Sequence, residues 1–583
     1  MGALALLFNA ATGPAIPFTP NAFQNPGWLF AVFFFLVFGL ISTFAILFLI
    51  EAIQAIPGNK HFQGDVEYAT MINFYFGPTF HIISQFVLYC ALHAQSIQSI
   101  ILSAQAIDHM LVDINSTCGL TFAWDISKIS WVCVREHGDK LSPFGDQFML
   151  FTFGILVVAL LVIPMTFTDL DGNMGIQYVS FFISLMMCAQ WISASFTKGL
   201  DFQRVMPTNT SLSNYGEVLG TIMLNMAVTL IIPSWVNIKS KDINIQRSVW
   251  AAMSIVTLSF VSVGFIVALA FISDNPNSLT VISQFGTPRI PSQITYYLFA
   301  FVFLIPTCPV NFIIAKDNLV QNEVTGEKLG FFLGFVLPWF LCIPIQTGNL
   351  LPIVQNWTST LFVATSSYIL PILLYFQCRE FRKRYNSERS LSKHQYQLLL
   401  KIHHRSSHIT SFVESKMAAL IESGREVPEW LNEDVPDPEH EDEIEQMASH
   451  NSCNLSLQTP ENISRVPSIT FTVADETNSQ PLLAGADVIE SPGLTTLSVN
   501  ENNTTLLTPD ILVLRGSSSD SHTSQLTHIS FASTLPALSD WKTPAFRAIP
   551  KWFPVQEHLV AIVVIAITST ITVCNIILML LPK

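Results

Sequence analysis

Lysine and arginine are absent from the first 59 residues, and the first of either is Lys60. A secretory signal peptide normally opens with positive charge, so the absence disfavours a signal peptide at the apolar N-terminus and leaves it, with a kinked helix end, as the alternative interpretation. Charged residues are also scarce, at 12% of the 583, whereas 50% are hydrophobic. This balance excludes an ordinary soluble protein and indicates a polytopic membrane protein.

Several chemical signatures are missing as well. The sequence has no glycine-rich phosphate loop, no nucleophile elbow and, among nine cysteines, no CxxC pair or Cys/His cluster. We therefore expect no enzyme, no cofactor, no metal site and no nucleic-acid partner. Cys118 and Cys133 lie together in one polar loop. They are a candidate disulfide or two free thiols, and the sequence leaves both open.

Apolar segments of about 20 residues, the length that crosses a bilayer, recur along the chain. After a first segment at residues 9–28 they run over 28–53, 80–110, 148–167, 175–196, 218–236, 249–272, 296–315, 329–345, 358–376 and 559–581. We predict an all-α membrane protein with eleven spans. Lysine and arginine are more frequent in the loops that face the cytoplasm if the N-terminus is cytoplasmic, so we expect that orientation.

The first segment contains Gly13, Pro14 and Pro17 at its middle. Proline removes a backbone donor and clashes with the preceding turn, so a continuous helix cannot run through it. Irregular backbone at membrane depth is tolerated where it lines a cavity, and the ends of two half-helices offer dipoles to a carboxylate and an ammonium. The predicted substrate-binding groups here come from Asn9, Ala11, Thr12, Gly13, Ala15 and Ile16, with Asn9 also an oxygen ligand for a coupling ion.

An inverted repeat would place a second interrupted helix five spans later. The segment 218–236 has Pro233 inside its apolar run, and Asn225 and Thr229 stand four residues apart on one helix face. We add Asn225, Met226 and Thr229 to the predicted substrate-binding residues. Proline alone is a weak signal, because four other spans also contain it.

The first stretch resembles the opening span of the amino acid/auxin permease family. Residues at the spacing of that family are Asn9, Gly13, Pro20, Ala22, Phe23, Gly27 and Trp28. The resemblance implies membership of the amino acid/polyamine/organocation superfamily, with inverted repeats of spans 1–5 and 6–10, discontinuous spans 1 and 6, and an added span 11. It also implies amino acid transport coupled to protons or sodium. The sequence departs from the family at Ala15, where a second glycine is usual.

Polar residues form a stripe on the third span, where His81, Gln85, Tyr89 and His93 recur every four residues. Such a stripe should face the bundle or a cavity. His93 is therefore either a proton carrier or a hydrogen-bonding residue between helices. In the eighth span, Thr307 beside Pro306 is either a sodium ligand or bonds its own backbone.

Residues 377–557 differ from the rest of the chain because they are rich in serine, threonine, asparagine, proline and acidic residues. We predict a largely disordered cytoplasmic insert between a transporter core at 1–376 and the last span at 558–583. Apolar residues at helical spacing predict an amphipathic helix at 396–422. The basic residues Arg382, Lys383 and Arg384 suit anionic lipid or act as a positive-inside signal.

Glycosylation sequons at Asn115, Asn209 and Asn356 fall in loops that the predicted orientation puts outside, so this is an expected glycoprotein. The leading hypothesis is a symporter for a small neutral amino acid. The main alternative is an amino acid sensor that signals through the insert to cytoplasmic regulators, and a channel stays open. The plasma membrane and a vacuole-like or lysosome-like membrane remain undecided.

Overall fold

The computed structural model of the chain describes residues 2–13, 16, 19–57, 59, 62, 66–123, 128–136, 142–145, 147–167, 170–203, 205–208, 212–238, 243–271, 290–346, 350–388, 391–405, 546–549 and 555–580. The chain divides into two units, residues 1–430 with 535–583 and residues 431–534. Every described residue belongs to the first unit. Asn209, Ala15 and the predicted helix beyond residue 405 lie outside the described residues.

The first apolar segment is interrupted, as the sequence predicts. Helix α1 (Gly2–Thr12) ends before the two prolines, and α2 (Thr19–Gln24) begins after them. At the end of α1 the Thr12 hydroxyl donates to the Phe8 carbonyl at 2.7 Å, and the Gly13 amide donates to the Asn9 carbonyl at 2.9 Å. The Gly13 amide thus closes the last turn of α1, and the Thr12 hydroxyl adds a second donor to the Phe8 carbonyl.

The sixth apolar segment is interrupted too. Helix α8 (Leu212–Asn225) stops, a short 3-10 helix η2 (Thr229–Ile231) follows, and α9 (Ile232–Ile238) completes the segment. Pro233 is the second residue of α9, where a helix tolerates the missing N–H. The predicted discontinuity of both segments is therefore confirmed.

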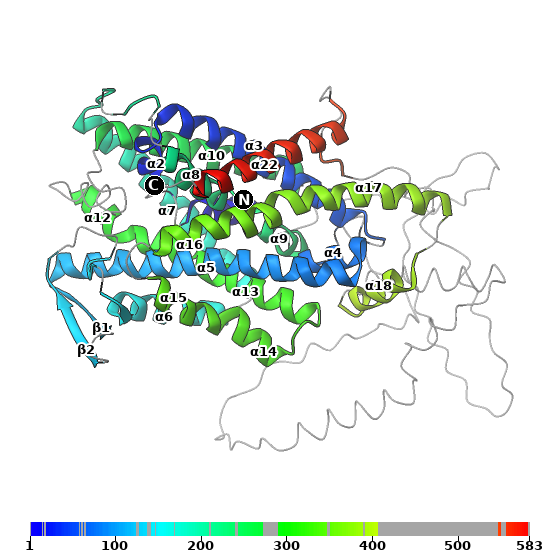
Figure 1. Cartoon of the computed structure of the whole chain (residues 1–583), viewed down its shortest axis with the longest axis horizontal. Helices are drawn as coiled ribbons and strands as arrows, with labels where there is room; N and C mark the ends of the chain where they lie inside the picture. Colours follow the sequence, from blue (N-terminus) through cyan, green and yellow to red (C-terminus); the bar gives the residue numbers. More distant parts are fainter. Residues whose placement is uncertain are drawn as a thin grey trace, which may run out of the picture. The chain divides into compact units, whose positions relative to one another are not determined.

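Figure 1 shows the remaining helices, of which α4 was not predicted from the sequence. They are α3 (Trp28–Gln54), α4 (Tyr68–Phe76), α5 (Pro78–Ile114), α6 (Phe153–Thr166), α7 (Leu170–Lys198), α10 (Ile245–Ala270), α12 (Ile290–Phe299), η4 (Ala300–Leu304), α13 (Thr307–Gln321), α14 (Glu327–Phe331), η5 (Phe332–Val336), α15 (Leu337–Ile345), α16 (Leu350–Thr358), η6 (Ser359–Ile369), α17 (Leu370–Glu388), α18 (Lys393–Arg405) and α22 (Glu557–Leu580). Elements η4, η5 and η6 are π-helical stretches inside longer helices.

Among the described residues, nine helices are long and apolar enough to cross a membrane, and α6 is a shorter apolar helix. The chain is thus a multi-pass helical membrane protein, while the count of eleven spans stays a prediction. Helix pairs recur when each span is matched with the one five places later: α1 packs on α7 and α10, and correspondingly α8 packs on η6 and α3. Likewise α7 packs on α10, and α17 packs on α3.

A small sheet, which the sequence did not reveal, follows α5. Strands β1 (Thr117–Ala123), β2 (Lys128–Val134) and β3 (Met149–Thr152) pair antiparallel in the order β2-β1-β3. Cys118 and Cys133 are opposite each other in the register and form a disulfide. The predicted helix at 148–167 therefore begins only at Phe153, because Met149–Thr152 pair with β1 and Thr152 accepts a bond from the Ile155 amide at the helix start.

The predicted glycan site at Asn356 is wrong on structural grounds. The side chain lies inside α16 and is 9% exposed. Its Oδ1 atom would collide with a Cβ added to Gly220 of α8, so the amide is packed between two helices. An attached oligosaccharide needs a surface position. Asn115 follows α5 directly and stays a prediction.

Helical structure extends into the predicted insert. Helix α17 continues to Glu388, and α18 packs on α4, with the His394 Nε2 atom 2.9 Å from Asn73 Oδ1. The far end of the insert is also fixed, because the amide of Ala548 donates to Glu51 Oε2 at 3.0 Å. The other oxygen of the buried Glu51 pairs with Arg382 at 2.8 Å. Both ends of the insert thus meet the same end of α3.

The contact between Gly220 and Asn356 gives a test of the packing. We expect Gly220→Ala to destabilise the protein by about 1–3 kcal/mol, because the new methyl group overlaps the Asn356 amide. Gly175→Ala is the matched control, since an added Cβ there meets nothing within 4 Å. Thermal unfolding of the purified proteins in detergent measures both, and equal midpoints for the two variants would contradict the packing.

Candidate functional site

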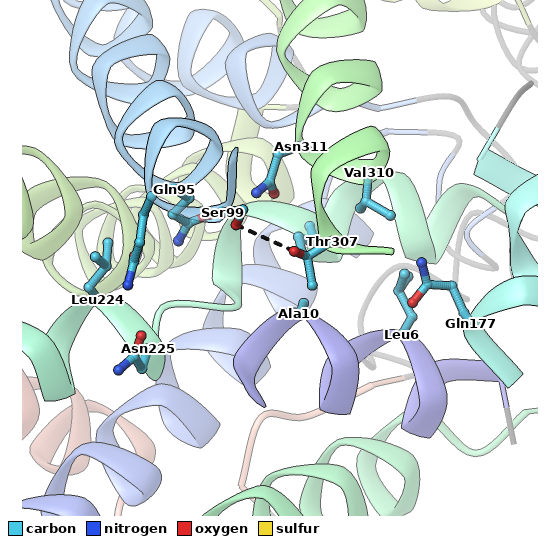
Figure 2. A pocket seen from close by; sticks show the side chains of 12 residues that line it. Leu6, Ala10, Gln95, Ser99, Gln177, Leu224, Asn225, Thr307, Val310 and Asn311 are labelled. Carbon is cyan, nitrogen blue, oxygen red and sulfur yellow. Dashed lines mark hydrogen bonds between the residues drawn. The ribbon is translucent and has the colours of Figure 1, made fainter. Parts of the chain in front are cut away.

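A polar cavity lies in the middle of the helix bundle, beside the interruption of the sixth segment (Figure 2). Helices α1, α5, α7, α8 and α13 and the 3-10 helix η2 contribute to its wall. Its lining residues are Leu6, Ala10, Gln95, Gln98, Ser99, Gln177, Leu224, Asn225, Ile231, Thr307, Val310 and Asn311. No lining residue in the described part of the chain is charged.

The cavity has a volume of about 20 Å³, counted as the space open to the centre of a water molecule. On that measure a single water needs about 10–15 Å³. One or two waters therefore fit, and an amino acid does not. Any larger ligand requires the surrounding helices or side chains to move.

The unwound turn of the sixth segment is held by side chains from three other helices. Ser42 of α3 donates to the Met226 carbonyl, Gln95 of α5 to the Ala227 carbonyl at 3.2 Å, and Tyr368 of η6 to the Met223 carbonyl at 2.6 Å. Carbonyl groups without a partner are costly in a membrane interior. These donors therefore stabilise the interruption, and one of the three carbonyls belongs to Met226, a predicted substrate-binding residue.

Asn9 and Gln177 join α1 and α7 to the eighth span. The Asn9 side-chain amide donates to both the carbonyl and the side-chain oxygen of Gln177, each at 2.8 Å. Gln177 in turn donates to the Pro306 carbonyl at 2.9 Å. One turn further along α7, Ser180 donates to the Val302 carbonyl at 2.5 Å. Pro306 has no N–H to offer Val302, so the hydroxyl takes over that role.

The first interruption approaches the eighth span at Gly13. A Cβ atom added there would lie 2.5 Å from the Thr307 methyl group and 3.1 Å from the Phe303 carbonyl oxygen. Only glycine fits this contact without displacement. On the other side of Thr307, its hydroxyl lies 3.3 Å from that of Ser99 (Figure 2). Thr307 therefore connects the first interruption, the eighth span and the cavity wall.

Of the residues predicted from the sequence, Asn225 and Thr307 line the cavity. The other described ones do not: Asn9, Ala11, Thr12, Gly13, Ile16, Met226, Thr229 and His93. Asn9 is one contact away through Gln177. Ala11, Thr12, Ile16 and Met226 are buried among the helices, and Thr229 is buried with an unpaired hydroxyl. The cavity thus borders the second interruption more closely than the first.

His93 lies between α5 and the ninth span. Its Nε2 atom is 2.8 Å from the Leu333 carbonyl in η5, and its Nδ1 atom is 3.1 Å from the Tyr89 carbonyl. Tyr89 also donates to the Leu333 carbonyl at 2.9 Å. This geometry is that of a residue that forms hydrogen bonds between helices. His93 does not line the cavity, so no direct contact supports a role as proton carrier.

The end of the bundle near α4 is closed by hydrogen bonds to α4 and to Glu67 just before it. The buried Glu67 carboxylate accepts from Ser234 at 3.0 Å and from Asn237 at 3.1 Å, both in α9. The Thr70 hydroxyl donates to Asn322 Oδ1 at 2.9 Å. Asn318, on the same helix as the lining residue Asn311, accepts from the Ala69 amide at 3.4 Å.

Five polar lining residues escaped the sequence-based site prediction: Gln95, Gln98, Ser99, Gln177 and Asn311. Gln95 and Gln98 lie on the third span, on a face next to its polar stripe, so the sequence marked their helix but not their role. Gln177 and Asn311 are isolated amides in mostly apolar spans, and no sequence signal marks them. Among the described residues, no group of three histidine, cysteine or acidic side chains could hold a metal ion.

No family model and no curated protein matches this sequence. Solved structures do match, and one is Mhp1, a nucleobase-cation-symport-1 family transporter, in a closed conformation with bromovinylhydantoin bound. The identity is 15%, the match covers 72% of this chain and 90% of that chain, and the TM-score is 0.46. A likeness of this degree does not identify a function, and the resemblance to amino acid/auxin permeases stays a prediction.

The Gly13 contact predicts a specific rescue. We expect Gly13→Ala to lower the unfolding midpoint and any ligand binding, because the methyl group collides with Thr307. Thr307→Ser removes the methyl group that lies closest, so the double variant Gly13→Ala/Thr307→Ser should recover at least half of the lost stability, about 1 kcal/mol or more. A double-mutant cycle from thermal unfolding measures this. Strictly additive losses would show that the two residues do not meet.

Proposed function

We propose that this protein is a secondary active transporter that moves a small neutral amino acid across a membrane by alternating access, coupled to a proton or sodium gradient. The observation that carries the proposal is the closed polar cavity beside the interrupted sixth segment. Polar groups inside a membrane bundle are costly unless they serve a function or are fully paired. Interrupted helices next to a polar cavity are the arrangement used by transporters to bind a solute at mid-membrane.

A neutral site suits a zwitterion, whose two charges cancel. The C-terminal end of α8 at Asn225 presents the negative end of the helix dipole to the cavity, and this favours an ammonium group. A substrate with a net charge would have to lose its hydration in a cavity whose wall offers no opposite charge, and this desolvation costs free energy. We therefore expect acidic and basic amino acids to be poor substrates.

The α4 contacts provide a gate for the proposed cycle. Asn311 in the cavity wall and Asn318 at the α4 contact are seven residues apart, and so on one face of α13. Release of α4 would open a polar path along this face toward the cavity. The predicted cytoplasmic N-terminus would make this path the cytoplasmic one.

For the coupling ion, the wall offers the hydroxyl oxygens of Ser99 and Thr307, which lie 3.3 Å apart. They are our candidates for sodium coordination, together with Asn9, whose side-chain oxygen is buried and unpaired. His93 remains the candidate for proton coupling, acting through the α5 contact with the ninth span rather than by direct contact with the solute.

An amino acid sensor is the alternative function, and the fixed ends of the insert favour it. Helix α18 contacts α4, and Ala548 contacts Glu51, so movement at this end of the bundle would reach the insert directly. The same contacts would regulate a transporter. Flux separates the two functions, because a sensor binds its ligand without net transport.

The proposal predicts saturable uptake of neutral amino acids. The purified full-length protein in proteoliposomes, with an imposed proton or sodium gradient, should accumulate at least one neutral amino acid above the level of empty vesicles. A panel of labelled amino acids, with uracil as a neutral amide that is not a zwitterion, measures the uptake. Binding without uptake would favour the sensor, and uptake of uracil alone would overturn the amino acid proposal.

The α4 gate predicts a change in access. In a variant carrying Asn311→Cys, a water-soluble thiol reagent applied from the α4 side should react about fivefold faster when Thr70→Val is added, since loss of one hydrogen bond costs about 1 kcal/mol. Thr365→Val is the matched control, because that exposed hydroxyl bonds only its own helix at Leu361. An equal reaction rate with and without Thr70→Val would argue against α4 as the gate.

A further inference from the structure

The cavity wall contains two kinds of amide side chain. Gln95 and Gln177 are engaged, since the first donates to the Ala227 carbonyl and the second joins Asn9 to the Pro306 carbonyl. Gln98, Asn225 and Asn311 have no hydrogen-bond partner among the residues that the structure describes, yet only 4%, 6% and 6% of their surfaces are exposed. The engaged amides hold the helices together, whereas the other three are available to bind a ligand.

The three unpaired amides come from three different helices. Gln98 lies on α5, Asn225 at the end of α8 and Asn311 on α13, and all three line the same cavity. Figure 2 labels Asn225 and Asn311. These amides line space that a water molecule can enter, so their donors and acceptors are available to whatever occupies the cavity. Three such groups around one cavity therefore favour a ligand that brings both donors and acceptors.

The chemistry of the amide group indicates what that ligand carries. A primary amide offers two N–H donors and an oxygen acceptor, and a second amide matches both without any charge. A hydrocarbon side chain would leave all three wall amides unpaired, and a site built for hydrogen bonding rejects such an analogue strongly. A carboxylate or ammonium side chain would be desolvated against a wall that has no opposite charge.

We infer that the site selects amino acids with a neutral hydrogen-bonding side chain, above all a carboxamide as in glutamine and asparagine, and that Gln98, Asn225 and Asn311 determine this selectivity. The inference rests on the proposed amino acid transport at this cavity. The cavity as it stands is too small for such a side chain. The helices that carry the three amides must therefore move apart when the ligand binds.

Competition in proteoliposomes tests the inference on the wild-type protein. Uptake of labelled glutamine should be inhibited by asparagine and serine at concentrations about tenfold lower than by methionine or leucine, and glutamate and lysine should inhibit least. Methionine is the key comparison, because its side chain has nearly the length of glutamine without the amide. Equal inhibition by methionine and asparagine would overturn the selectivity but leave amino acid transport in place.

Variants assign the selectivity to residues. Asn311→Leu and Asn225→Leu should each raise the uptake of methionine relative to glutamine by about tenfold or more. Gln355→Leu is the matched control, because it makes the same kind of replacement on α16, outside the cavity, where the Gln355 amide nitrogen is buried and unpaired. An unchanged ratio in both cavity variants would remove these residues from the selectivity mechanism.

Two further outcomes are distinguishable. If a variant lowers the unfolding midpoint and loses all uptake, the wild-type competition series still decides the selectivity. If folded wild-type protein accumulates no amino acid under any gradient, the proposed function fails first and the selectivity falls with it.

Discussion

A break in a helix inside a bilayer exposes backbone carbonyl groups to a medium that offers them no partner, and the arrangement of this protein follows from how it meets that demand. At the sixth segment, Ser42, Gln95 and Tyr368 each satisfy one carbonyl of the broken turn. At the eighth span, Gln177 donates to the carbonyl of Pro306 and Ser180 to that of Val302. Polar side chains are therefore gathered around the broken helices for structural reasons, and the cavity wall contains both amides that serve this need and others that do not.

The same constraint connects the cavity with the end of the bundle near α4. Polar side chains continue along α5 and α13, and they bind α4 rather than lipid. Glu51 extends this polar region, since its carboxylate holds both Arg382 and the amide of Ala548. In the proposed cycle, ligand in the cavity, closure by α4 and the position of the insert are thus linked by direct contacts, without any need for a long-range signal.

The sequence revealed the interruptions because proline and glycine act locally, and Gly13, Pro17 and Pro233 state where a helix cannot continue. It revealed the spans because an apolar run of about 20 residues can also be recognised locally. It did not reveal which polar residues share the cavity, because Gln177 and Asn311 come together only through packing between distant spans. It also misjudged Asn356, whose sequon is local but whose burial against Gly220 is not. The sheet after α5 was missed because its short strands resemble an ordinary polar loop followed by a span.

A structure determined with glutamine at saturating concentration would test the central claim most directly. The account predicts density for one glutamine molecule in an enlarged cavity beside the second interruption, with its side-chain amide within hydrogen-bonding distance of Asn225 and Asn311. Density at another position, or an unchanged cavity in a protein that demonstrably binds glutamine, would contradict it.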